Sequence, residues 1–357
     1  MTALTVAIAA GGTGGHVYPG LAVAELLRER GHRVVWLGTR SGLEGRVVPA
    51  AGVEAEWLEI QGLRGKGLAA QLRLPWRLGR AVAVAGAALR RRRPDVVLGM
   101  GGYVAGPVGL AARLAGRPLV IHEQNARAGL TNRFLARLGR RVLTGFPDTL
   151  GARGEWVGNP IRTSIHRLEA PRSRYAGRPE APRVLVLGGS QGARTLNRFV
   201  PKALAGLDRP RPQVLHQAGE LTLEEARTGY RQLGLDVEVV PFIEDMAGAY
   251  AWADLVVARA GALTVAELAA AGVPAVLVPL PWAVDDHQTA NAELLCAAGA
   301  ARCLPEGDVE QGALGAVLAD LLADRERLAG MGEAARDVAR PDATDRVATI
   351  CEEVAHG

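Results

Sequence analysis

Cysteine and lysine are both scarce in this chain of 357 residues. The three cysteines, Cys296, Cys303 and Cys351, are odd in number and form no C-x-x-C pair. A disulfide framework or a zinc site is therefore not expected, and a reducing compartment is the default. Only Lys66 and Lys202 are lysines, so arginine supplies nearly all of the positive charge. We interpret this bias as one of genome composition or thermophily before one of function.

Long apolar runs are also missing. No uninterrupted apolar stretch approaches the roughly 20 residues that a membrane-spanning helix needs. The first apolar run, residues 4–10, passes directly into a glycine loop and lacks the pattern of a signal peptide. We therefore expect a cytoplasmic protein. The net charge of +5 and the isoelectric point of about 9.5 suit nucleic acid, anionic lipid or phosphorylated substrates, and charge alone does not choose among them.

Apolar runs and helix-like segments alternate along the whole chain. This alternation predicts an α/β protein with mostly parallel sheets covered by helices on both faces. Because the pattern restarts near residue 183, we expect two Rossmann-like, doubly wound domains. The expected strands are residues 4–9, 33–37, 95–98, 118–122 and 141–144 in the first half, and 183–187, 213–217, 237–241, 254–258 and 274–278 in the second.

The expected domains are residues 1–160 and 161–342, with a hinge near 158–162. Residues 343–357 carry apolar side chains at helical spacing. We expect them to form a terminal helix that completes the first domain.

Three glycine-rich loops follow expected strands: GGTGGH at 11–16, GMGGYVAGP at 99–107 and GGSQGAR at 188–194. Glycines allow backbone N–H groups to approach a phosphate, and a following helix N-terminus favours an anion. An ordinary tight turn is the alternative for the first loop alone, and close helix–sheet packing explains the second loop alone equally well. The first loop is not a dinucleotide fingerprint, because Val17 replaces its third glycine and no acidic residue ends the second strand.

Polar residues gather at further strand ends, in HEQN at 122–125, GALTVAE at 261–267 and DDHQTAN at 285–291. Thr264 and Glu267 have the spacing of a capping box, and Glu267 could instead accept sugar hydroxyls. A metal site at Asp285, Asp286 and His287 is a weak alternative, because no partner cluster is evident elsewhere.

Seven segments together resemble one family, the bacterial glycosyltransferases that add N-acetylglucosamine to undecaprenyl-pyrophosphoryl-muramoyl-pentapeptide (lipid I). They span the chain in order and are GGTGGHVYPGLAVAELL at 11–27, GMGGYVAGP at 99–107, HEQNARAGLTNR at 122–133, GNPIR at 158–162, LGGSQGARTLN at 187–197, GALTVAEL at 261–268 and DDHQTANA at 285–292. One departure is Ala260, where the family commonly has serine.

The resemblance implies a GT-B fold and UDP-N-acetylglucosamine (UDP-GlcNAc) as donor, with no metal or other cofactor. It implies lipid I as acceptor and lipid II as product, used in peptidoglycan synthesis. It also implies a peripheral enzyme on the cytoplasmic face of an anionic membrane, with cell-wall synthesis and division proteins as possible partners and no nucleic acid. The implied donor-binding residues are Thr13, Gly14, Gly15, Asn125, Arg162, Ser190, Ile243, Ala262, Leu263, Thr264, Val265, Ala266, Glu267, Gln288 and Asn291.

The acceptor pyrophosphate is expected at Gly14, Gly15, Gly101, Gly102 and Tyr103. Transfer from an α-linked donor to a β-1,4 glycoside requires inversion, so the acceptor C4 hydroxyl must lose a proton as it attacks. We expect His16 to be the general base, with Glu123 as the second candidate. In the alternative interpretation, His16 binds the acceptor phosphate or holds the loop.

Residues 63–80 interleave apolar side chains with arginines, which is typical of a segment that lies in a membrane interface. The expected membrane contacts are Leu68, Leu72, Leu74, Trp76, Arg73 and Arg77. An ordinary amphipathic surface segment is the alternative.

Two other functions stay open at this point. The chain could be another GT-B enzyme, such as a glycolipid glycosyltransferase or a UDP-GlcNAc 2-epimerase. It could also be a UDP-sugar-binding protein without catalysis.

Overall fold

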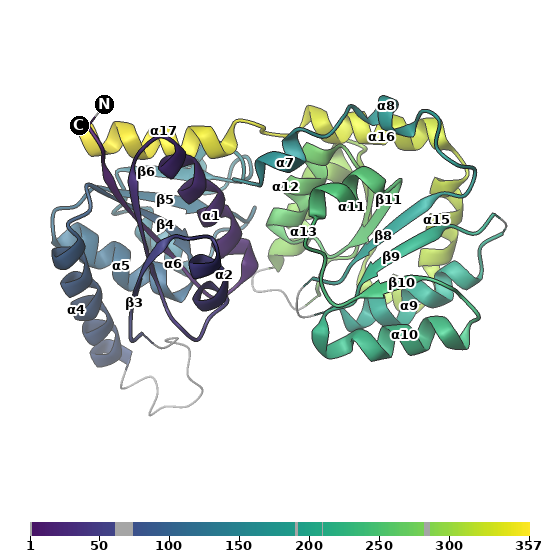
Figure 1. Cartoon of the computed structure of the whole chain (residues 1–357), viewed down its shortest axis with the longest axis horizontal. Coiled ribbons are helices and arrows are strands. Elements are labelled where there is room, and N and C mark those ends of the chain that lie inside the picture. The colour runs from purple at the N-terminus through teal and green to yellow at the C-terminus, as the bar shows by residue number, and fades with distance from the viewer. Residues whose placement is uncertain (1, 61–73, 190–191, 209, 282–285) are drawn as a thin grey trace. The chain divides into compact units, whose positions relative to one another are not determined.

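The structure of the chain, a computed structural model, describes residues 2–60, 74–189, 192–208, 210–281 and 286–357 (Figure 1). The chain divides into two compact units. Unit 1 comprises Met1–Arg162 and Arg340–Gly357, and unit 2 comprises Thr163–Ala339. These limits differ by a few residues from the expected ones, and Arg162, expected at the start of the second domain, falls in unit 1.

The described residues of unit 1 form a seven-stranded parallel sheet in the order β3-β2-β1-β4-β5-β6-β7. Its strands are β1 (Thr5–Ala10), β2 (Arg33–Gly38), β3 (Glu54–Trp57), β4 (Val96–Gly101), β5 (Leu119–Glu123), β6 (Arg141–Thr144) and β7 (Glu155–Trp156). Its helices are α1 (Gly14–Glu29), α2 (Glu44–Ala50), α4 (Leu74–Arg92), α5 (Gly102–Leu114), α6 (Leu130–Leu135), the 3₁₀ turn η1 (Gly151–Arg153) and α17 (Ala343–His356).

The central strands of this sheet are buried on both faces. Every residue of β4 and all but the first residue of β1 are buried, as the continuous apolar runs predict for a parallel sheet covered by helices. The terminal helix α17 packs on α1 and β4 and buries Val347, Ile350 and Val354 in their core cluster. Arg30, the C-cap residue of α1, pairs with Asp345 and Glu352 of α17, which adds charge pairing to that apolar contact.

The described residues of unit 2 form a six-stranded parallel sheet in the order β10-β9-β8-β11-β12-β13. Its strands are β8 (Arg183–Leu187), β9 (Gln213–Gln217), β10 (Glu238–Val240), β11 (Leu255–Ala258), β12 (Ala275–Leu277) and β13 (Ala301–Cys303). Its helices are α7 (Thr163–His166), α8 (Pro171–Tyr175), α9 (Arg194–Ala205), the 3₁₀ turn η2 (Glu220–Thr222), α10 (Leu223–Gln232), α11 (Met246–Trp252), α12 (Ala262–Ala271), α13 (His287–Ala297), α14 (Glu306–Glu310), α15 (Ala313–Leu322) and α16 (Arg325–Asp337).

Both sheets confirm the predicted α/β class with doubly wound parallel strands. All ten expected strands are present, whereas β3, β7 and β13 were not expected. In each sheet the strand order reverses next to the first strand, between β1 and β4 in unit 1 and between β8 and β11 in unit 2. Ligands of open α/β sheets bind at such switch points, beyond the carboxyl ends of the strands.

In the part of the chain that the structure describes, no helix is both long and apolar enough to cross a bilayer.

Candidate functional site

The switch point of unit 1 brings together the first two glycine loops. Ala10 at the end of β1 pairs with Gly101 at the end of β4, across a local register shift. A Cβ placed on Gly102 would lie 2.1 Å from the carbonyl oxygen of Gly11, and Gly102 has a φ of +78°. Only glycine fits this contact, so the second loop must be glycine-rich to approach the first.

Two helices start at this switch point. Helix α1 begins at Gly14 after Thr13, and helix α5 begins at Gly102 after Gly101. Thr13 makes no side-chain hydrogen bond to α1, and Gly101 has no side chain that could cap α5. Since the first N–H groups of a helix lack partners within the helix, both ends favour an anionic group.

A buried glutamate that sequence reasoning missed holds the first loop. Glu44 is fully buried at the start of α2, and its Oε2 accepts the N–H of Gly12 at 3.1 Å. Its Oε1 accepts the Thr39 N–H at 3.2 Å and the Thr39 hydroxyl at 2.8 Å. These three donors compensate the buried carboxylate, and they occupy the Gly12 N–H. Gly12 therefore does not offer that N–H to a ligand in this arrangement.

The imidazole of His16 lies in the first turn of α1. Its side chain is half-buried, but the Nδ1 atom is fully enclosed and has no hydrogen-bond partner among the described residues. Burial lowers the pKa of His16 from 6.5 to about 4, and the nearby Glu44 carboxylate partly opposes this shift. The ring is therefore neutral near pH 7.

The end of β5 and the residues that follow it form a hydrogen-bond network. The fully buried His122 lies with Nε2 2.9 Å from the Gly158 carbonyl oxygen and Nδ1 3.1 Å from the Gln124 amide nitrogen. Because a carbonyl only accepts, Nε2 carries the proton and Nδ1 accepts from Gln124. Burial lowers the pKa of His122 to about 4, so this histidine is also neutral near pH 7.

Both carboxylate oxygens of Glu123 are occupied. Oε1 accepts the N–H of Asn125 at 2.9 Å and its side-chain amide at 3.2 Å. Oε2 accepts the N–H of Gly129 at 3.1 Å and the amide of Asn132 at 3.0 Å. Burial raises the pKa of Glu123, and these hydrogen bonds oppose the rise. Glu123 thus fixes the backbone and side chain of Asn125.

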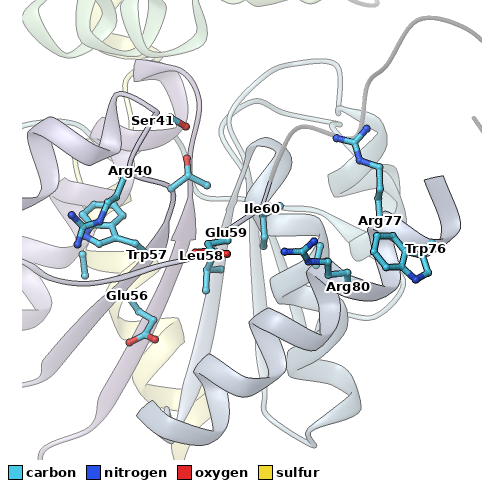
Figure 2. Close-up of a pocket in the computed structure, with 13 residues that line it drawn as sticks. Arg40, Ser41, Glu56, Trp57, Leu58, Glu59, Ile60, Trp76, Arg77 and Arg80 are labelled. Carbon is cyan, nitrogen blue, oxygen red and sulfur yellow. The ribbon is translucent and has the colours of Figure 1, made fainter. Parts of the chain in front are cut away.

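A cavity of about 920 Å³ opens beside the ends of β2 and β3, next to α4 (Figure 2). Trp76, Arg77 and Arg80 line it from α4, and Arg40 and Trp57 line it from the opposite side. The side chain of Trp76 is 71% exposed.

This cavity is linked to the glycine loops. Thr39, which also lines it, lies with its hydroxyl oxygen 2.6 Å from the Tyr103 hydroxyl. Since Thr39 donates its proton to Glu44, Tyr103 donates to Thr39. Of the expected membrane contacts, Leu68, Leu72 and Arg73 lie outside the described residues, and Leu74 is the first residue of α4.

The switch point of unit 2 carries the third glycine loop. A Cβ placed on Gly192 would lie 2.1 Å from the Thr222 hydroxyl oxygen and 2.5 Å from the Ala218 carbonyl oxygen, and the φ of Gly192 is +79°. Close backbone packing therefore requires this glycine, as in the second loop. Ser190 lies outside the described residues.

Helix α12 follows β11, the strand that pairs with β8, and begins after Gly261. Thr264 lies inside the helix and Gly261 is its N-cap, so the capping-box alternative for Thr264 and Glu267 is wrong. Glu267 is buried and accepts the Tyr250 hydroxyl at 3.0 Å. The preceding positions of the helix, residues 262–266, include the buried Ala262 and Val265.

Two further expected donor-binding residues, Asn291 and Gln288, are held by backbone groups. The fully buried Asn291 donates from its amide to the Ala260 carbonyl at 3.1 Å, and Gln288 accepts the Leu280 N–H at 3.0 Å. Ile243 is buried just after β10. Arg162, in unit 1, stacks over the Tyr18 ring at 5.4 Å from guanidinium carbon to ring centre.

No group of three or more His, Cys, Asp or Glu side chains is placed to hold a metal ion within the described ranges. Asp285, part of the weak metal alternative, lies outside those ranges.

Both halves of the chain match domains of the same protein family, and its relatives match it over nearly the full length. Residues 6–144 match the glycosyltransferase family 28 N-terminal domain, and residues 183–347 match the family 28 C-terminal domain. The UDP-N-acetylglucosamine–N-acetylmuramyl-(pentapeptide) pyrophosphoryl-undecaprenol N-acetylglucosamine transferase of Halorhodospira halophila is 84% identical, over 100% of both chains. The enzyme of the same name from Burkholderia thailandensis is 53% identical, over 99% of this chain and 97% of that one.

Solved structures with the same fold include a member of this family. The crystal structure of Acinetobacter baumannii MurG superposes with a TM-score of 0.83 at 41% identity, covering 98% of this chain and 99% of that one. A Neisseria meningitidis UDP-GlcNAc 2-epimerase superposes with a TM-score of 0.68 at 12% identity, over 98% of this chain and 100% of that one, which reflects the shared fold alone. The predicted GT-B architecture and the predicted resemblance are both confirmed, and the chain belongs to glycosyltransferase family 28.

Proposed function

We propose that this protein transfers N-acetylglucosamine from UDP-GlcNAc to the C4 hydroxyl of the muramoyl sugar of lipid I, with inversion, and so makes lipid II for peptidoglycan synthesis. The observation that carries the proposal is the 84% identity, over the full length of both chains, to a transferase whose name states this donor and acceptor. The two switch points, each with a glycine loop and a helix start, are suited to two phosphate-bearing substrates.

The donor would bind mainly to unit 2. The start of α12, residues 262–266, and the loop at 188–193 with Ser190 would face the diphosphate, together with Arg162. Glu267 would accept the ribose hydroxyls, and its bond from Tyr250 at 3.0 Å supports a fixed orientation of the carboxyl group. Ile243 would contact uracil through its backbone. Gln288, Asn291 and Asn125 would bind the sugar.

The acceptor pyrophosphate would bind to unit 1, at the converging starts of α1 and α5. Thr13, Gly14 and Gly15 border this position on one loop, and Gly101, Gly102 and Tyr103 on the other. The bond from Tyr103 to Thr39 supports the proposal, because it ties the second loop to the Glu44 network that also fixes Gly12.

His16 would accept the proton of the acceptor hydroxyl. Its pKa is lowered to about 4, so the ring is neutral near pH 7 and has a lone pair to accept a proton, and the same shift makes it a weaker base than an ordinary histidine. Since Nδ1 is enclosed, Nε2 would be the accepting nitrogen. Glu123 is less suited to this task, because four hydrogen bonds occupy its two oxygens. We propose it as a positioning residue for Asn125.

The leaving UDP gains negative charge as the sugar departs. Helix N-termini and Arg162 would stabilise this charge, so that the protein's own groups supply the electrostatic part of catalysis.

Unit 1 would meet the cytoplasmic face of an anionic membrane. The cavity beside α4 combines two indole rings with three arginines and two glutamates, Glu56 and Glu59, and its arginines Arg77 and Arg80 on α4 would face the anionic lipid. The exposed Trp76 and its neighbour Arg77 would contribute directly. Peripheral attachment, cytoplasmic location and contacts with cell-wall synthesis or division proteins all belong to this proposal.

A transfer assay tests the function. The full-length protein is incubated with UDP-GlcNAc and a water-soluble lipid I analogue, and UDP release and the glycosylated product are followed together. We expect UDP release only with acceptor, in a 1:1 ratio with product, as one bond breaks for each bond that forms. Release without acceptor would indicate a hydrolase, a new UDP-sugar would indicate an epimerase, and no release would indicate a binding protein; each would overturn the proposal.

A further inference from the structure

The aromatic ring of Tyr18 contacts two parts of the proposed site. Tyr18 lies in α1, four residues after Gly14, and helix side chains tilt towards the N-terminus so that residues four apart share a face. A Cβ placed on Gly14 would accordingly lie 3.1 Å from Cε2 and 3.2 Å from Cδ2 of the Tyr18 ring. The guanidinium carbon of Arg162 lies over the same ring, 5.4 Å from its centre. One side chain thus joins the first glycine loop to Arg162.

The backbone that leads to Arg162 is anchored in unit 1. The side-chain amide of Asn159 donates to a backbone carbonyl oxygen at 3.0 Å, and the carbonyl oxygen of the buried Ile161 accepts the Thr344 hydroxyl at 3.3 Å. These contacts set where the Arg162 side chain begins, but several rotatable bonds separate its guanidinium from that backbone. The Tyr18 ring supplies a contact at the far end of the side chain, where the charge is.

Stacking on a ring suits an arginine that binds a phosphate. A guanidinium cation is attracted to the face of an aromatic ring when it lies within about 6 Å of the ring centre. Because that contact uses the flat face of the guanidinium, it does not consume the N–H groups in its plane, which can bond two oxygens of one phosphate. An arginine that is already held on a ring also loses less rotamer entropy when its ligand binds.

We propose that Tyr18 is a positioning residue for Arg162, whose guanidinium it holds in the orientation that binds the diphosphate of the leaving nucleotide. This inference rests on the proposed function, in which Arg162 stabilises the departing UDP. Because the same ring packs on Gly14, the first residue of α1, it also links the position of Arg162 to the helix start that carries His16. The ring face makes the contact, so the Tyr18 hydroxyl is not needed for this role.

The charges of the two nucleotides separate this role from a purely structural one. UDP ends in a free phosphate, which carries more negative charge than the same phosphate in UDP-GlcNAc, where the sugar esterifies it. An oriented cation therefore favours UDP over UDP-GlcNAc, and loss of that orientation should weaken UDP binding more. A general distortion of the loop or of the fold would weaken the binding of both nucleotides alike. The ratio of the two dissociation constants is thus the readout that is specific to positioning.

A double-mutant cycle in the full-length protein tests the proposal, with kcat and the Kd values of UDP and UDP-GlcNAc as readouts. We expect Tyr18→Leu to lower kcat and weaken UDP binding by about three- to tenfold, with a smaller change for UDP-GlcNAc. In the Arg162→Ala background, Tyr18→Leu should add less than about a twofold further loss, because the side chain that it positions is absent. Tyr18→Phe should stay within about twofold of the wild type. Phe199→Leu is the control and should change none of these quantities, since Arg198 stacks on Phe199 at the same 5.4 Å but within α9 of unit 2.

A graded series keeps the test conclusive even if circular dichroism shows that Tyr18→Leu does not fold. Tyr18→Phe and its fluorinated analogues at the same position keep the shape of the ring, while each added fluorine withdraws electron density from the ring face and weakens its attraction for a cation. UDP affinity should fall stepwise along this series. Additive losses in the double variant, equal losses for UDP and UDP-GlcNAc, or a flat fluorine series would overturn the proposal. Absence of transfer by the wild type would instead overturn the proposed function.

Discussion

The imidazole of His16 lies against the α-carbon of Gly101, so that a Cβ at Gly101 would be 3.3 Å from both Cδ2 and Nε2 of the ring. Gly101 also has a φ of +97°, a conformation that other residues adopt only with strain. We expect Gly101→Ala to displace the His16 ring. The predicted result is a loss of kcat of at least about tenfold, together with about 1 to 3 kcal/mol of stability, measured by the transfer assay and by urea unfolding.

Gly116→Ala is the matched control for that change. Gly116 has a φ of +67°, and nothing lies within 4 Å of its Cβ position. The control should lose comparable stability and keep its kcat. Equal losses of kcat in the two variants would show that the strain acts on folding alone and that the contact with His16 is irrelevant to turnover.

The buried Glu44 should be important for stability. Glu44→Ala leaves the Gly12 N–H and the Thr39 N–H and hydroxyl without their acceptor, and an unsatisfied buried donor costs about 1 to 3 kcal/mol. We expect a loss of about 3 kcal/mol in the free energy of unfolding and increased proteolysis of the first loop. Glu25→Ala, at an exposed position of α1, should change stability by less than about 0.5 kcal/mol. A Glu44→Ala protein as stable as this control would contradict the network.

The pH profile of kcat/KM depends on the proposed base. A base is active when deprotonated, and the pKa of His16 is lowered from 6.5 to about 4. Activity should therefore stay constant as the pH falls from 7 to about 5 and decline only as the pH approaches 4. In Glu44→Gln the decline should move to still lower pH, because the carboxylate that raises the His16 pKa is neutralised. A decline centred near pH 6.5 would contradict the lowered pKa of His16.

Membrane binding should depend on the exposed indole beside α4. We expect Trp76→Ser to reduce binding to vesicles that contain anionic lipid by about tenfold, since it removes an apolar contact from a surface bordered by arginines. Flotation with and without anionic lipid measures this. Leu114→Ser is the control, because Leu114 is 74% exposed, much like Trp76 at 71%, but ends α5 instead of lining the cavity. Equal effects of the two substitutions would leave the cavity without a membrane role.

The sequence predicted the parts of the fold that depend on local pattern. Apolar runs marked every central strand, because a strand covered on both faces must be apolar throughout. Glycine pairs marked the loops at both switch points. The missed strands β3, β7 and β13 lie at sheet edges, are at most four residues long and include exposed or charged side chains, so no continuous apolar run reveals them.

The sequence could not predict contacts that depend on tertiary packing. Glu44 looks like an ordinary helix-start acid, and its burial follows only from the approach of Gly11 and Thr39 from two different strands. Two other features also depend on residues distant in the sequence: the enclosure of His16 Nδ1, and the hydrogen bonds that occupy both carboxylate oxygens of Glu123. The spacing of Thr264 and Glu267 was misleading, because the helix begins three residues earlier and Glu267 is paired with Tyr250 instead.

The most direct test of the account is the turnover of His16→Ala at saturating UDP-GlcNAc and lipid I analogue, with donor affinity measured separately by calorimetry and His356→Ala, at an exposed position of α17, as control. General-base catalysis by His16 predicts a fall in kcat of roughly 10² to 10⁴ with the donor Kd nearly unchanged. Near-wild-type turnover with intact donor affinity would contradict the assignment of His16 as the base.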